Sequence, residues 1–418
     1  MALLFFDKSD RGANASKEGI MTRSLRWMPV LLVLVLLPLT ALGQSTERMF
    51  KVGLLMPYTG VFAVVGQDAT RGVELSLNKI GTLGGLKIQI LKEDEETKPD
   101  VALIKARKLV ESDKVDVLVG PVSAQVAMAI RNYIHERGIP LIVPVAGVSQ
   151  LTAPPMASPW IFRITDTNDM SNFSMGTWVF KKTPYRKVVI MASDFVAGHA
   201  SVGAFMAAFK AAGGEIVKEI YIPLNTADFA PYLAQIAGLK ADAVYAWFAG
   251  ADAIRFVKGY KEYGLATKFP LLGYNSLVDD IILPTLGDAA IGITSVGHYS
   301  AALDTPENRI FVREYEAKYN ARPTRYSEQG FVAGQLIVAT LEELKGEASD
   351  RVKLQDALRR TVAKIHPPRG PIQFDRYQQV ITNIYVMKVE KQGGQLVNTI
   401  VDRIPNVSQE VTWKWWNK

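Results

Sequence analysis

The chain has 418 residues, of which 48% are hydrophobic and 21% charged, which is an ordinary globular composition, and its length predicts two or three domain-sized units. It has no cysteine, which excludes a disulfide framework, a thiolate metal site and a cysteine nucleophile, and its four histidines are too scattered to favour a metalloenzyme. The net charge of +7 comes without basic runs, so we expect no nucleic-acid partner.

Residues 1–43 have the pattern of a cleavable secretory signal. Two arginines precede an apolar run over residues 28–39, and a small-residue cleavage site ends at Gly43. The apolar run is short for a membrane span, although a membrane anchor is the alternative interpretation. Residues 1–20 have no targeting pattern, which favours translation from Met21. We therefore expect a mature protein in the periplasm of a Gram-negative cell.

A first series of alternating strands and helices follows the leader. Strands are predicted at residues 50–56, 86–91, 115–119 and 140–145, and helices at residues 69–80, 101–111 and 124–137. The strands are apolar on both faces and are separated by helices. This pattern predicts a parallel sheet that is covered on both sides.

A second series of similar size comes next. Strands are predicted at residues 187–191, 215–222, 242–248 and 269–273, and helices at residues 201–212, 229–237 and 252–263. A long helical region over 307–365, interrupted at Pro323 and at a turn over 346–350, leads to a strand at 384–389. We expect two α/β lobes that face each other across a ligand cleft, because ligands bind beyond the carboxyl ends of parallel strands. Closure on a hinge would couple binding to shape.

The turn between the strand ending at Val119 and the next helix is the first candidate binding element. Ser123 is a good N-cap, and the amides from Ala124 onward are donors at the positive end of a helix, where a carboxylate binds well. A plain N-cap facing water remains the alternative. Small residues end the following strand, and they either let a ligand approach the backbone or form a simple turn. These small residues are Val145, Ala146 and Gly147.

Aromatic residues follow several predicted strands. Each offers a flat face to a ligand or packs at the rim of a lobe, and the pattern leaves both interpretations open. These residues are Tyr58 and Phe62 in the first turn, Trp247, and Tyr274, which is followed by Asn275. We predict no enzyme, because the sequence has no nucleophile elbow, phosphate-binding loop or dinucleotide fingerprint. His199 near Asp194 is interpreted as a solvated helix start.

Several short motifs occur together in a recognisable order. They are Lys51-Val52-Gly53-Leu54-Leu55, Thr59-Gly60, the helix 68–78, Gly120-Pro121-Val122-Ser123, residues 139–144, Leu151-Thr152, Phe162-Arg163 and Ala211-Ala212-Gly213-Gly214. With these motifs the chain resembles the Leu/Ile/Val-binding family of periplasmic solute-binding proteins of ABC importers, from Phe50 to Val401.

The resemblance implies the type I fold, an α/β architecture in which two Rossmann-like lobes are joined by a three-stranded hinge. The lobes would comprise residues 49–165 plus 297–366 and residues 166–296 plus 367–402, with a tail over 403–418. The crossings would fall near 164–166, 295–299 and 367–372.

The resemblance also implies that Ser123 and Ala124 hold a ligand carboxylate. In amino-acid binders a threonine, a tyrosine and an acidic residue hold the ammonium, and the matching positions here are Gly147, Ala197 and Asn275. Burying an ammonium without acceptors or a countercharge costs several kcal/mol. We therefore predict a carboxylate ligand without an α-ammonium.

Residues 246–253 and 297–300 are similar to a branch of the family that takes aromatic acids. Four rings could form the flat walls of such a site, namely Phe195, Trp247, Tyr274 and Tyr299. We predict a monomeric, cofactor-free importer subunit that passes a benzoate- or phenylpropenoid-type acid to an inner-membrane ABC permease. Uptake of a branched-chain or other amino acid is the alternative, favoured if Asp194 or Glu328 reaches an ammonium. The ligand sensor of a signalling system is a further alternative.

Overall fold

The computed structural model describes residues 48–78, 82–83 and 86–416, and the compact unit that contains them spans Thr46–Lys418. The predicted signal segment, residues 1–43, lies outside the described residues. In the part of the chain that is described, the helices are too short or too polar to cross a membrane. The unit is built on two sheets with helices on both faces of each, and we call each sheet with its helices a lobe.

The sheet of the first lobe has six strands in the order β2-β3-β1-β4-β5-β6. The strands are β1 (Arg48–Met56), β2 (Thr82–Leu83), β3 (Leu86–Asp94), β4 (Val117–Val119), β5 (Leu141–Val143) and β6 (Ile161–Arg163). All neighbours are parallel except β2 and β3. Successive residues of β1 face opposite sides, so that Leu54 and Leu55 belong to different core clusters. The sheet therefore needs helices on both faces.

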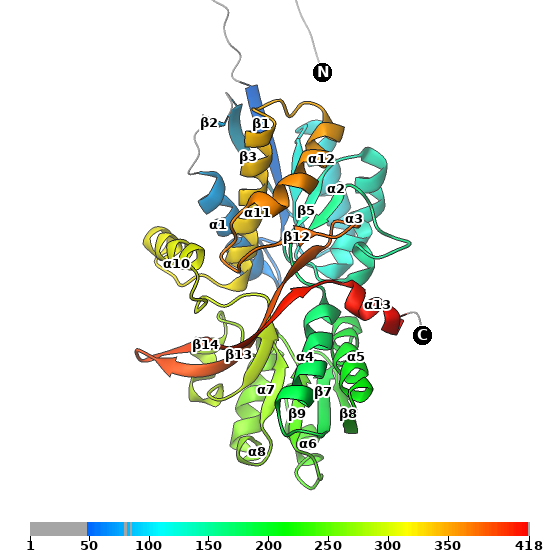
Figure 1. The fold of residues 1–418 in the computed structure, drawn as a ribbon, viewed down its shortest axis with the longest axis vertical. Helices are drawn as coiled ribbons and strands as arrows, with labels where there is room; N and C mark the ends of the chain where they lie inside the picture. The colour runs from blue at the N-terminus through cyan, green and yellow to red at the C-terminus, as the bar shows by residue number, and fades with distance from the viewer. Residues whose placement is uncertain (1–47, 79–81, 84–85, 417–418) are drawn as a thin grey trace, which may run out of the picture. The chain divides into compact units, whose positions relative to one another are not determined.

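Those helices come from two distant parts of the chain (Figure 1). One face is covered by α1 (Ala63–Leu77), α11 (Arg325–Glu343) and α12 (Arg351–Thr361), and the other by α2 (Pro99–Arg107), its π-helical continuation η1 (Lys108–Ser112) and α3 (Ala124–Arg137). The Asp68 carboxylate of α1 accepts hydrogen bonds at the start of α11, from the Ser327 N–H at 3.1 Å and from the Thr324 hydroxyl. These hydrogen bonds hold the start of α11 against α1 of the first lobe.

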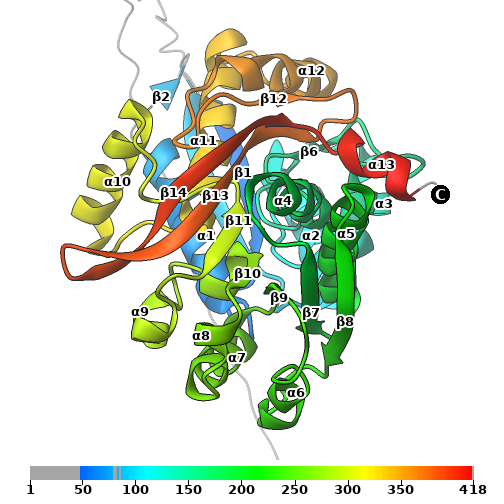
Figure 2. The same cartoon turned by 60° about the horizontal axis from the view of Figure 1, so that its bottom comes forward.

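The sheet of the second lobe has the order β12-β13-β11-β10-β9-β7-β8, and β14 pairs with β13 (Figure 2). The strands are β7 (Lys187–Ser193), β8 (Glu215–Ile222), β9 (Ala243–Trp247), β10 (Leu271–Tyr274), β11 (Thr294–Gly297), β12 (Gln373–Phe374), β13 (Val380–Gln392) and β14 (Gln395–Val407). Strands β7 to β11 are parallel to one another, whereas β13 is antiparallel to β11, β12 and β14.

Helices of the second lobe also cover both faces of its sheet. One face carries α4 (Asn168–Lys182) and α5 (Val196–Ala211), and the other carries α6 (Ala230–Ala234), α7 (Gly250–Glu262), α8 (Leu265–Lys268) and α9 (Leu283–Leu286). Two further helices are α10 (Pro306–Tyr319) and the C-terminal α13 (Glu410–Trp416). The short 3-10 segments are η2 (Ser149–Leu151), η3 (Asn275–Val278), η4 (Gly287–Ala289) and η5 (Val362–Lys364).

The two-lobed α/β fold predicted from the sequence is confirmed, and several elements keep their predicted limits, including α3 and β8. The long helical region divides into α10, α11 and α12 at the predicted interruptions. Two helices start earlier than predicted, α1 at Ala63 and α5 at Val196. The sequence analysis missed α4, whose buried face includes the polar residues Asp169, Ser171 and Asn172 and so lacks an apolar period.

The predicted division into lobes differs from the observed strands at one point. The tail was predicted to begin at residue 403, but β14 continues to Val407, with Arg403 opposite Tyr385 and Val407 opposite Thr382 of β13. Ladder pairing to β13 holds these residues in the second sheet. The division of the remaining residues between the lobes stays a prediction.

Candidate functional site

The turn after β4 places Ser123 at the start of α3. Gly120 has φ +141°, and a Cβ there would lie 2.0 Å from the Leu55 carbonyl oxygen, so only glycine fits this approach. Ser123 is buried at 8% exposure, and within the described part of the chain its side chain makes no capping hydrogen bond. Ala124 is half-buried beside it. The first amides of this 14-residue helix are therefore left to an outside acceptor.

A buried carboxyl lies close to the same turn. Glu95 follows β3 and is fully buried, and among the described residues neither carboxyl oxygen has a hydrogen-bond partner. Burial raises the pKa of Glu95 to about 7, although the nearby backbone of Thr97 and Val122 opposes the rise. A neutral Glu95 would add no negative charge next to the amides of α3. Sequence analysis did not single out Glu95, because a Glu in a polar turn is normally solvated.

Small residues after β5 complete the first-lobe part of the site. Val145 and Gly147 are half-buried and Ala146 is buried, with its N–H donating to the Pro121 carbonyl at 3.3 Å. Gly147 accepts a hydrogen bond from the Asn168 N–H at 2.8 Å, and a Cβ on Gly147 would lie 2.6 Å from Asn168 Oδ1. A larger residue at 147 would have to displace the first side chain of α4. This contact links the two lobes.

The second-lobe part of the site lies at the carboxyl ends of β9 and β10. Trp247 ends β9 and packs against Phe195, the N-cap of α5, with ring centroids 5.4 Å apart. Tyr274 ends β10 and belongs to the same core cluster, and Asn275 follows it. Ala197, in the first turn of α5, also packs on this cluster. These residues combine an apolar wall with few polar groups, which is typical of a small-molecule site.

Arg325, the first residue of α11, bridges the lobes. Its Nε donates to Asp279 Oδ2 at 2.8 Å, and its Nη1 donates to the Tyr274 hydroxyl at 3.1 Å. Its Nη2 donates to the Tyr326 hydroxyl at 2.6 Å. The sequence analysis missed this residue, because nothing in the local pattern around 325 indicates that it meets a carboxylate from the other lobe.

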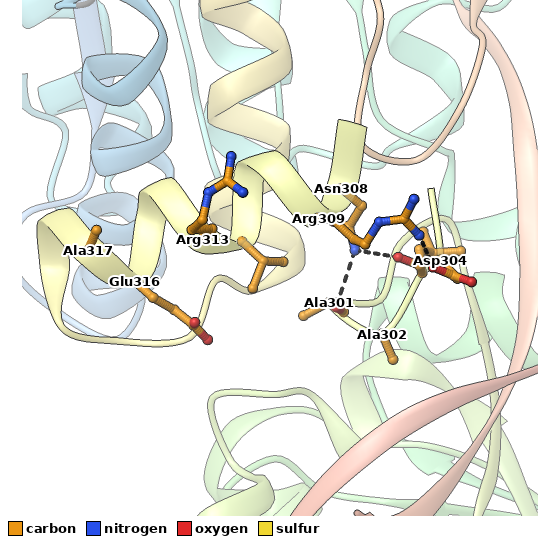
Figure 3. A pocket seen from close by; sticks show the side chains of 10 residues that line it. Ala301, Ala302, Asp304, Asn308, Arg309, Arg313, Glu316 and Ala317 are labelled. Atoms are coloured by element: carbon orange, nitrogen blue, oxygen red, sulfur yellow. Dashed lines mark hydrogen bonds and ion pairs between the residues drawn. The ribbon is translucent and has the colours of Figure 1, made fainter. Parts of the chain in front are cut away.

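A surface hollow of about 640 Å³ lies between α10 and the loop that precedes it (Figure 3). Its walls combine alanine, leucine and valine side chains with charged ones, including an ion pair between Arg309 and Asp304 and, along α10, Arg313 and Glu316. Its lining contains none of the residues that the sequence analysis assigned to the ligand. We therefore place the candidate site at the two sheet ends and not in this hollow.

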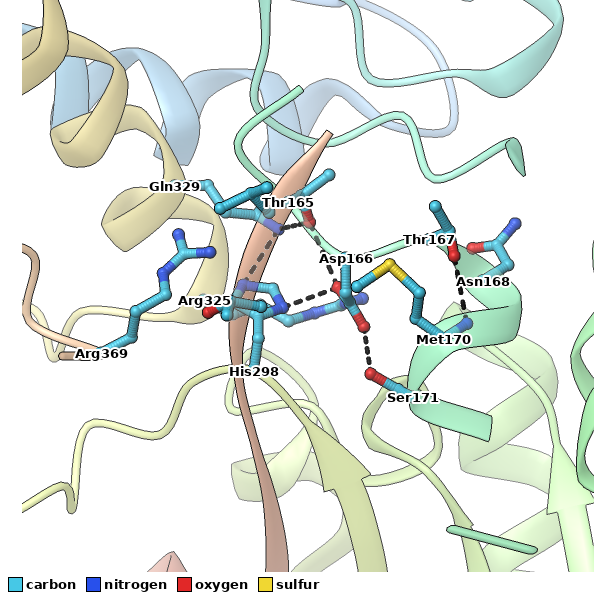
Figure 4. A network of polar contacts seen from close by, with 12 residues as sticks. Thr165, Asp166, Thr167, Asn168, Met170, Ser171, His298, Arg325, Gln329 and Arg369 are labelled. Atoms are coloured by element: carbon cyan, nitrogen blue, oxygen red, sulfur yellow. Dashed lines mark hydrogen bonds and ion pairs between the residues drawn. The ribbon is translucent and has the colours of Figure 1, made fainter. Parts of the chain in front are cut away.

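A buried polar network joins the hinge crossings next to the site (Figure 4). The Asp166 carboxylate meets His298 Nδ1 at 2.7 Å and accepts from the Ser171 hydroxyl, while the Gln329 amide donates to Thr165 Oγ1 at 2.7 Å and lies 3.2 Å from His298 Nε2. Burial lowers the pKa of His298, so the imidazole is neutral, with Nδ1–H donating to Asp166 and Nε2 accepting from Gln329. The network links two of the segments that connect the lobes, one at Thr165 and Asp166 and one at His298.

A buried ion pair lies in the same region between the lobes. Arg369 and Glu328 are both fully buried, with Arg369 Nε donating to Glu328 Oε1 at 2.8 Å, and Arg369 Nη1 donates to the Ile164 carbonyl at 2.9 Å. The Glu328 carboxylate is thus already paired with Arg369. Asp194, the other candidate partner for an ammonium, is about half exposed and pairs with His199 at 2.7 Å.

Comparison with known proteins identifies the family. The model of the family described as "Periplasmic binding protein" matches residues 50–395. The chain belongs to the periplasmic binding protein family. Membership implies a periplasmic location, and the family is a substrate-binding component of transport rather than a family of enzymes. The predicted resemblance to the Leu/Ile/Val-binding proteins is confirmed.

Three relatives of this periplasmic binding protein are informative. It is 29% identical to "Leu/Ile/Val-binding protein homolog 6" of Brucella melitensis, over 84% of this chain and 90% of that protein. It is 37% identical to an R. palustris ABC-transporter solute-binding protein in complex with benzoate (TM-score 0.77, 87% and 98% covered). It is 32% identical to one from Rhodopseudomonas palustris BisB5 in complex with 3,4-dihydroxy benzoic acid (TM-score 0.79, 87% and 99% covered).

Three other aromatic residues of the predicted site do not belong to the Trp247 cluster. The Tyr58 hydroxyl is 2.9 Å from Thr70 Oγ1, and the partly buried ring packs against the core cluster of the first lobe. Burial raises the pKa of Tyr58 to about 12. Phe62 is 37% exposed at the start of α1. Tyr299 is buried in a separate cluster with Phe311, and its hydroxyl donates to Asn308 at 2.9 Å.

The four rings predicted to line the site do not pack in a single core cluster. Phe195, Trp247 and Tyr274 share one cluster, but Tyr299 does not join them. The direction of a side chain at a strand end depends on how the strand leaves the sheet, and spacing along the chain does not determine it. Whether the remaining site residues contact a ligand stays a prediction.

Proposed function

We propose that this periplasmic binding protein captures a small aromatic carboxylate that lacks an α-ammonium, closes its two lobes on it and delivers it to an inner-membrane ABC permease. The observation that carries the proposal is the start of α3, where the buried Ser123 leaves the first amides of the helix uncapped within the described chain. Unsatisfied amides at the positive end of a helix favour an anion.

The surroundings of a bound carboxylate support a ligand without a positive charge. At the positions that hold an ammonium in amino-acid binders, this chain has Gly147, Ala197 and Asn275, none of which is charged. Asn168 restricts the space beside Gly147. Glu328 is already neutralised by Arg369. An ammonium buried here would lose its hydration without gaining a counterion, which is strongly unfavourable.

Flat apolar surface supports an aromatic ring. Phe195 and Trp247 meet at an interplanar angle of 54°, at the edge where the strands of the second lobe end. Aromatic side chains of this kind favour stacked or edge-on contact with another ring. The similarity to two R. palustris proteins in complex with benzoate and with 3,4-dihydroxy benzoic acid supports the same ligand class.

Amino-acid binding is the second candidate, because the Brucella melitensis relative is named as a Leu/Ile/Val-binding protein homolog. It would require an acidic group to approach an ammonium. Asp194 is the remaining candidate of those predicted, and it would have to leave His199 and turn inward.

Isothermal titration calorimetry of the purified mature protein distinguishes the two candidates. We expect benzoate or a substituted benzoate to bind in the micromolar range or tighter, and leucine, isoleucine and valine to give no heat of binding. Tight leucine binding without benzoate binding would refute the proposal.

The place of the carboxylate is tested by Ser123→Asp. Aspartate is as good an N-cap as serine, so α3 is expected to stay folded, while the added charge at the helix start repels the ligand and lowers its affinity at least 100-fold. Thr305→Asp is the matched control, since Thr305 is the N-cap of α10 and accepts from the Asn308 N–H. The control should keep wild-type affinity.

A further inference from the structure

Two buried N–H donors at the edge of the second sheet have no acceptor in the part of the chain that the structure describes. Trp247 is 7% exposed and Asn275 is 2% exposed, and within the described chain neither Trp247 Nε1 nor Asn275 Nδ2 makes a hydrogen bond. An indole Nε1–H can only donate a hydrogen bond, so the partner that it lacks must be an acceptor. Most buried polar groups in proteins are satisfied, and a buried donor without an acceptor is costly.

Several polar groups near this edge are satisfied within the described chain. The Tyr245 hydroxyl, two residues before Trp247, donates to Asn172. The Tyr274 hydroxyl, directly before Asn275, accepts from Arg325 at 3.1 Å. Trp178, which packs against the same core cluster as Trp247, donates from Nε1 to Asp402 at 2.8 Å. The hydroxyls of Ser201 and Ser295 in the same lobe also lack a partner among the described residues. Trp247 Nε1 and Asn275 Nδ2 differ from these hydroxyls because they can only donate, so each of them needs an acceptor.

The two donors lie at one edge of the sheet. Strands β9 and β10 are parallel neighbours in which Ala246 is opposite Gly273, so Trp247 and Asn275 both follow the last paired rows. Asn275 lies against β11, since a Cβ on Gly297 would be 3.0 Å from Asn275 Cβ. This is the edge beyond which an open parallel sheet binds its ligand, and Phe195 adds an aromatic face next to Trp247.

We infer that the aromatic acid carries a hydrogen-bond acceptor at the end of the ring opposite its carboxylate, and that Trp247 Nε1–H and Asn275 Nδ2–H donate to it. The inference rests on the proposed function, in which the carboxylate binds in the first lobe at α3. The second lobe then binds an acceptor at the other end of the ring. The preferred ligand is therefore a para-oxygenated aromatic acid, whose carboxylate contacts the first lobe and whose para oxygen contacts the second. Such a ligand also couples binding to closure, because neither lobe alone satisfies both of its ends.

A set of para-substituted benzoates tests the inference by calorimetry. 4-Hydroxybenzoate and 4-methylbenzoate have nearly the same size, but only the first offers an acceptor, and 4-aminobenzoate offers mainly donors. A site built to bond an oxygen rejects the analogue without it. We expect 4-hydroxybenzoate to bind at least tenfold more tightly than 4-methylbenzoate and than 4-aminobenzoate.

Two variants assign the preference to the two donors. Trp247→Phe removes the Nε1–H while keeping an aromatic ring, and Asn275→Leu removes the amide at similar volume. Each should reduce the 4-hydroxy to 4-methyl affinity ratio to within about threefold of one. Trp178→Phe, which removes a donor bonded to Asp402, is the matched control and should keep the wild-type ratio.

The outcomes separate this inference from the proposed function. Equal affinities for 4-hydroxybenzoate and 4-methylbenzoate in the wild type, or a tighter 4-aminobenzoate, would overturn the inference while leaving aromatic-acid binding intact. A preference that survives in both variants would overturn the assignment to Trp247 and Asn275. Failure of all the benzoates to bind would overturn both, since there would be no aromatic ligand for the donors to receive.

Discussion

Glu95 lies directly after β3, and its side chain is completely buried. Among the described residues its carboxyl oxygens have no hydrogen-bond partner at normal distance, and burial raises its pKa to about 7, above the ordinary value of 4.5. Because the pKa is higher in the folded than in the unfolded state, the protonated acid favours folding. The contribution is complete below about pH 4.5 and is lost as the pH rises through about 7.

Glu95→Gln is expected to remove this pH dependence. At pH 8 the variant should be more stable than the wild type by about 3 kcal/mol, and near pH 4.5 the two should be nearly equal. Urea unfolding at a series of pH values measures the difference. Glu96→Gln, at the exposed neighbouring position, is the control and should track the wild type. A wild-type advantage at pH 8 would contradict the expected sign.

Gly147 offers a second test at the scale of a single contact. A Cβ at this position would lie 2.6 Å from Asn168 Oδ1, so Gly147→Ala should destabilise the protein by about 1 kcal/mol. Asn168→Ala removes the obstructing atom, and the double variant should recover most of the loss. A coupling energy of at least about 0.5 kcal/mol in a double-mutant cycle would support the contact, and additivity would argue against it.

At the scale of elements, the packing of α1 on α11 depends on two glycines. A Cβ on Gly330 would lie 1.9 Å from the Ala69 carbonyl oxygen, and one on Gly72 would lie 1.9 Å from the Ser327 carbonyl oxygen. In both cases the obstruction is backbone, which cannot rotate away. The two helix axes can approach this closely only because neither position carries a side chain.

Gly330→Ala should therefore be strongly destabilising, by about 3 kcal/mol or more, even though alanine is the better helix former. Gly259→Ala is the matched control within α7, where the nearest atom is a flexible Leu233 methyl at 3.1 Å. We expect the control to be neutral or slightly stabilising. Thermal and urea unfolding of both variants compare the two glycines, and equal effects would mean that helix propensity outweighs the packing.

At the scale of the whole molecule, Arg325 holds the two lobes together. Its guanidinium leaves the first lobe on α11 and meets Asp279 and Tyr274 of the second, and Asp279 is only 5% exposed. Removing one partner of a buried ion pair leaves the other charge buried without a counterion. This raises the free energy of the form in which the two lobes are in contact. Opening would hydrate both groups.

Arg325→Gln is thus expected to shift the ligand-free protein toward open forms and to weaken ligand binding by about tenfold, because closure has lost a favourable contact. Small-angle scattering should report a larger radius of gyration for the variant without ligand. Arg360→Gln, which breaks a surface pair with Glu343 inside one lobe, is the control. An unchanged radius and affinity would mean that Arg325 does not contribute to closure.

The local pattern of the chain was sufficient for most elements of the fold. The strand run 215–222 and the helix 124–137 have strong periodicity and clear stops, and the structure confirms both. The pattern was insufficient for α4, because its buried face carries Asp169 and Ser171. Those residues are buried as hydrogen-bonded groups of the hinge, a role that depends on residues far away in sequence such as His298.

The sequence by itself determined the alternation of strands and helices, the two lobes and the serine at the start of α3, because each depends on residues within one or two turns of one another. The tertiary structure decided which side chains from distant parts of the chain contact one another and which are buried. It placed Arg325 against Asp279, buried Glu95 beside α3, left Trp247 Nε1 without an acceptor among the described residues and moved Tyr299 to another cluster. Charge, burial and hydrogen bonding depend on the surroundings in space, and in this fold those surroundings come from segments more than a hundred residues apart as well as from near neighbours.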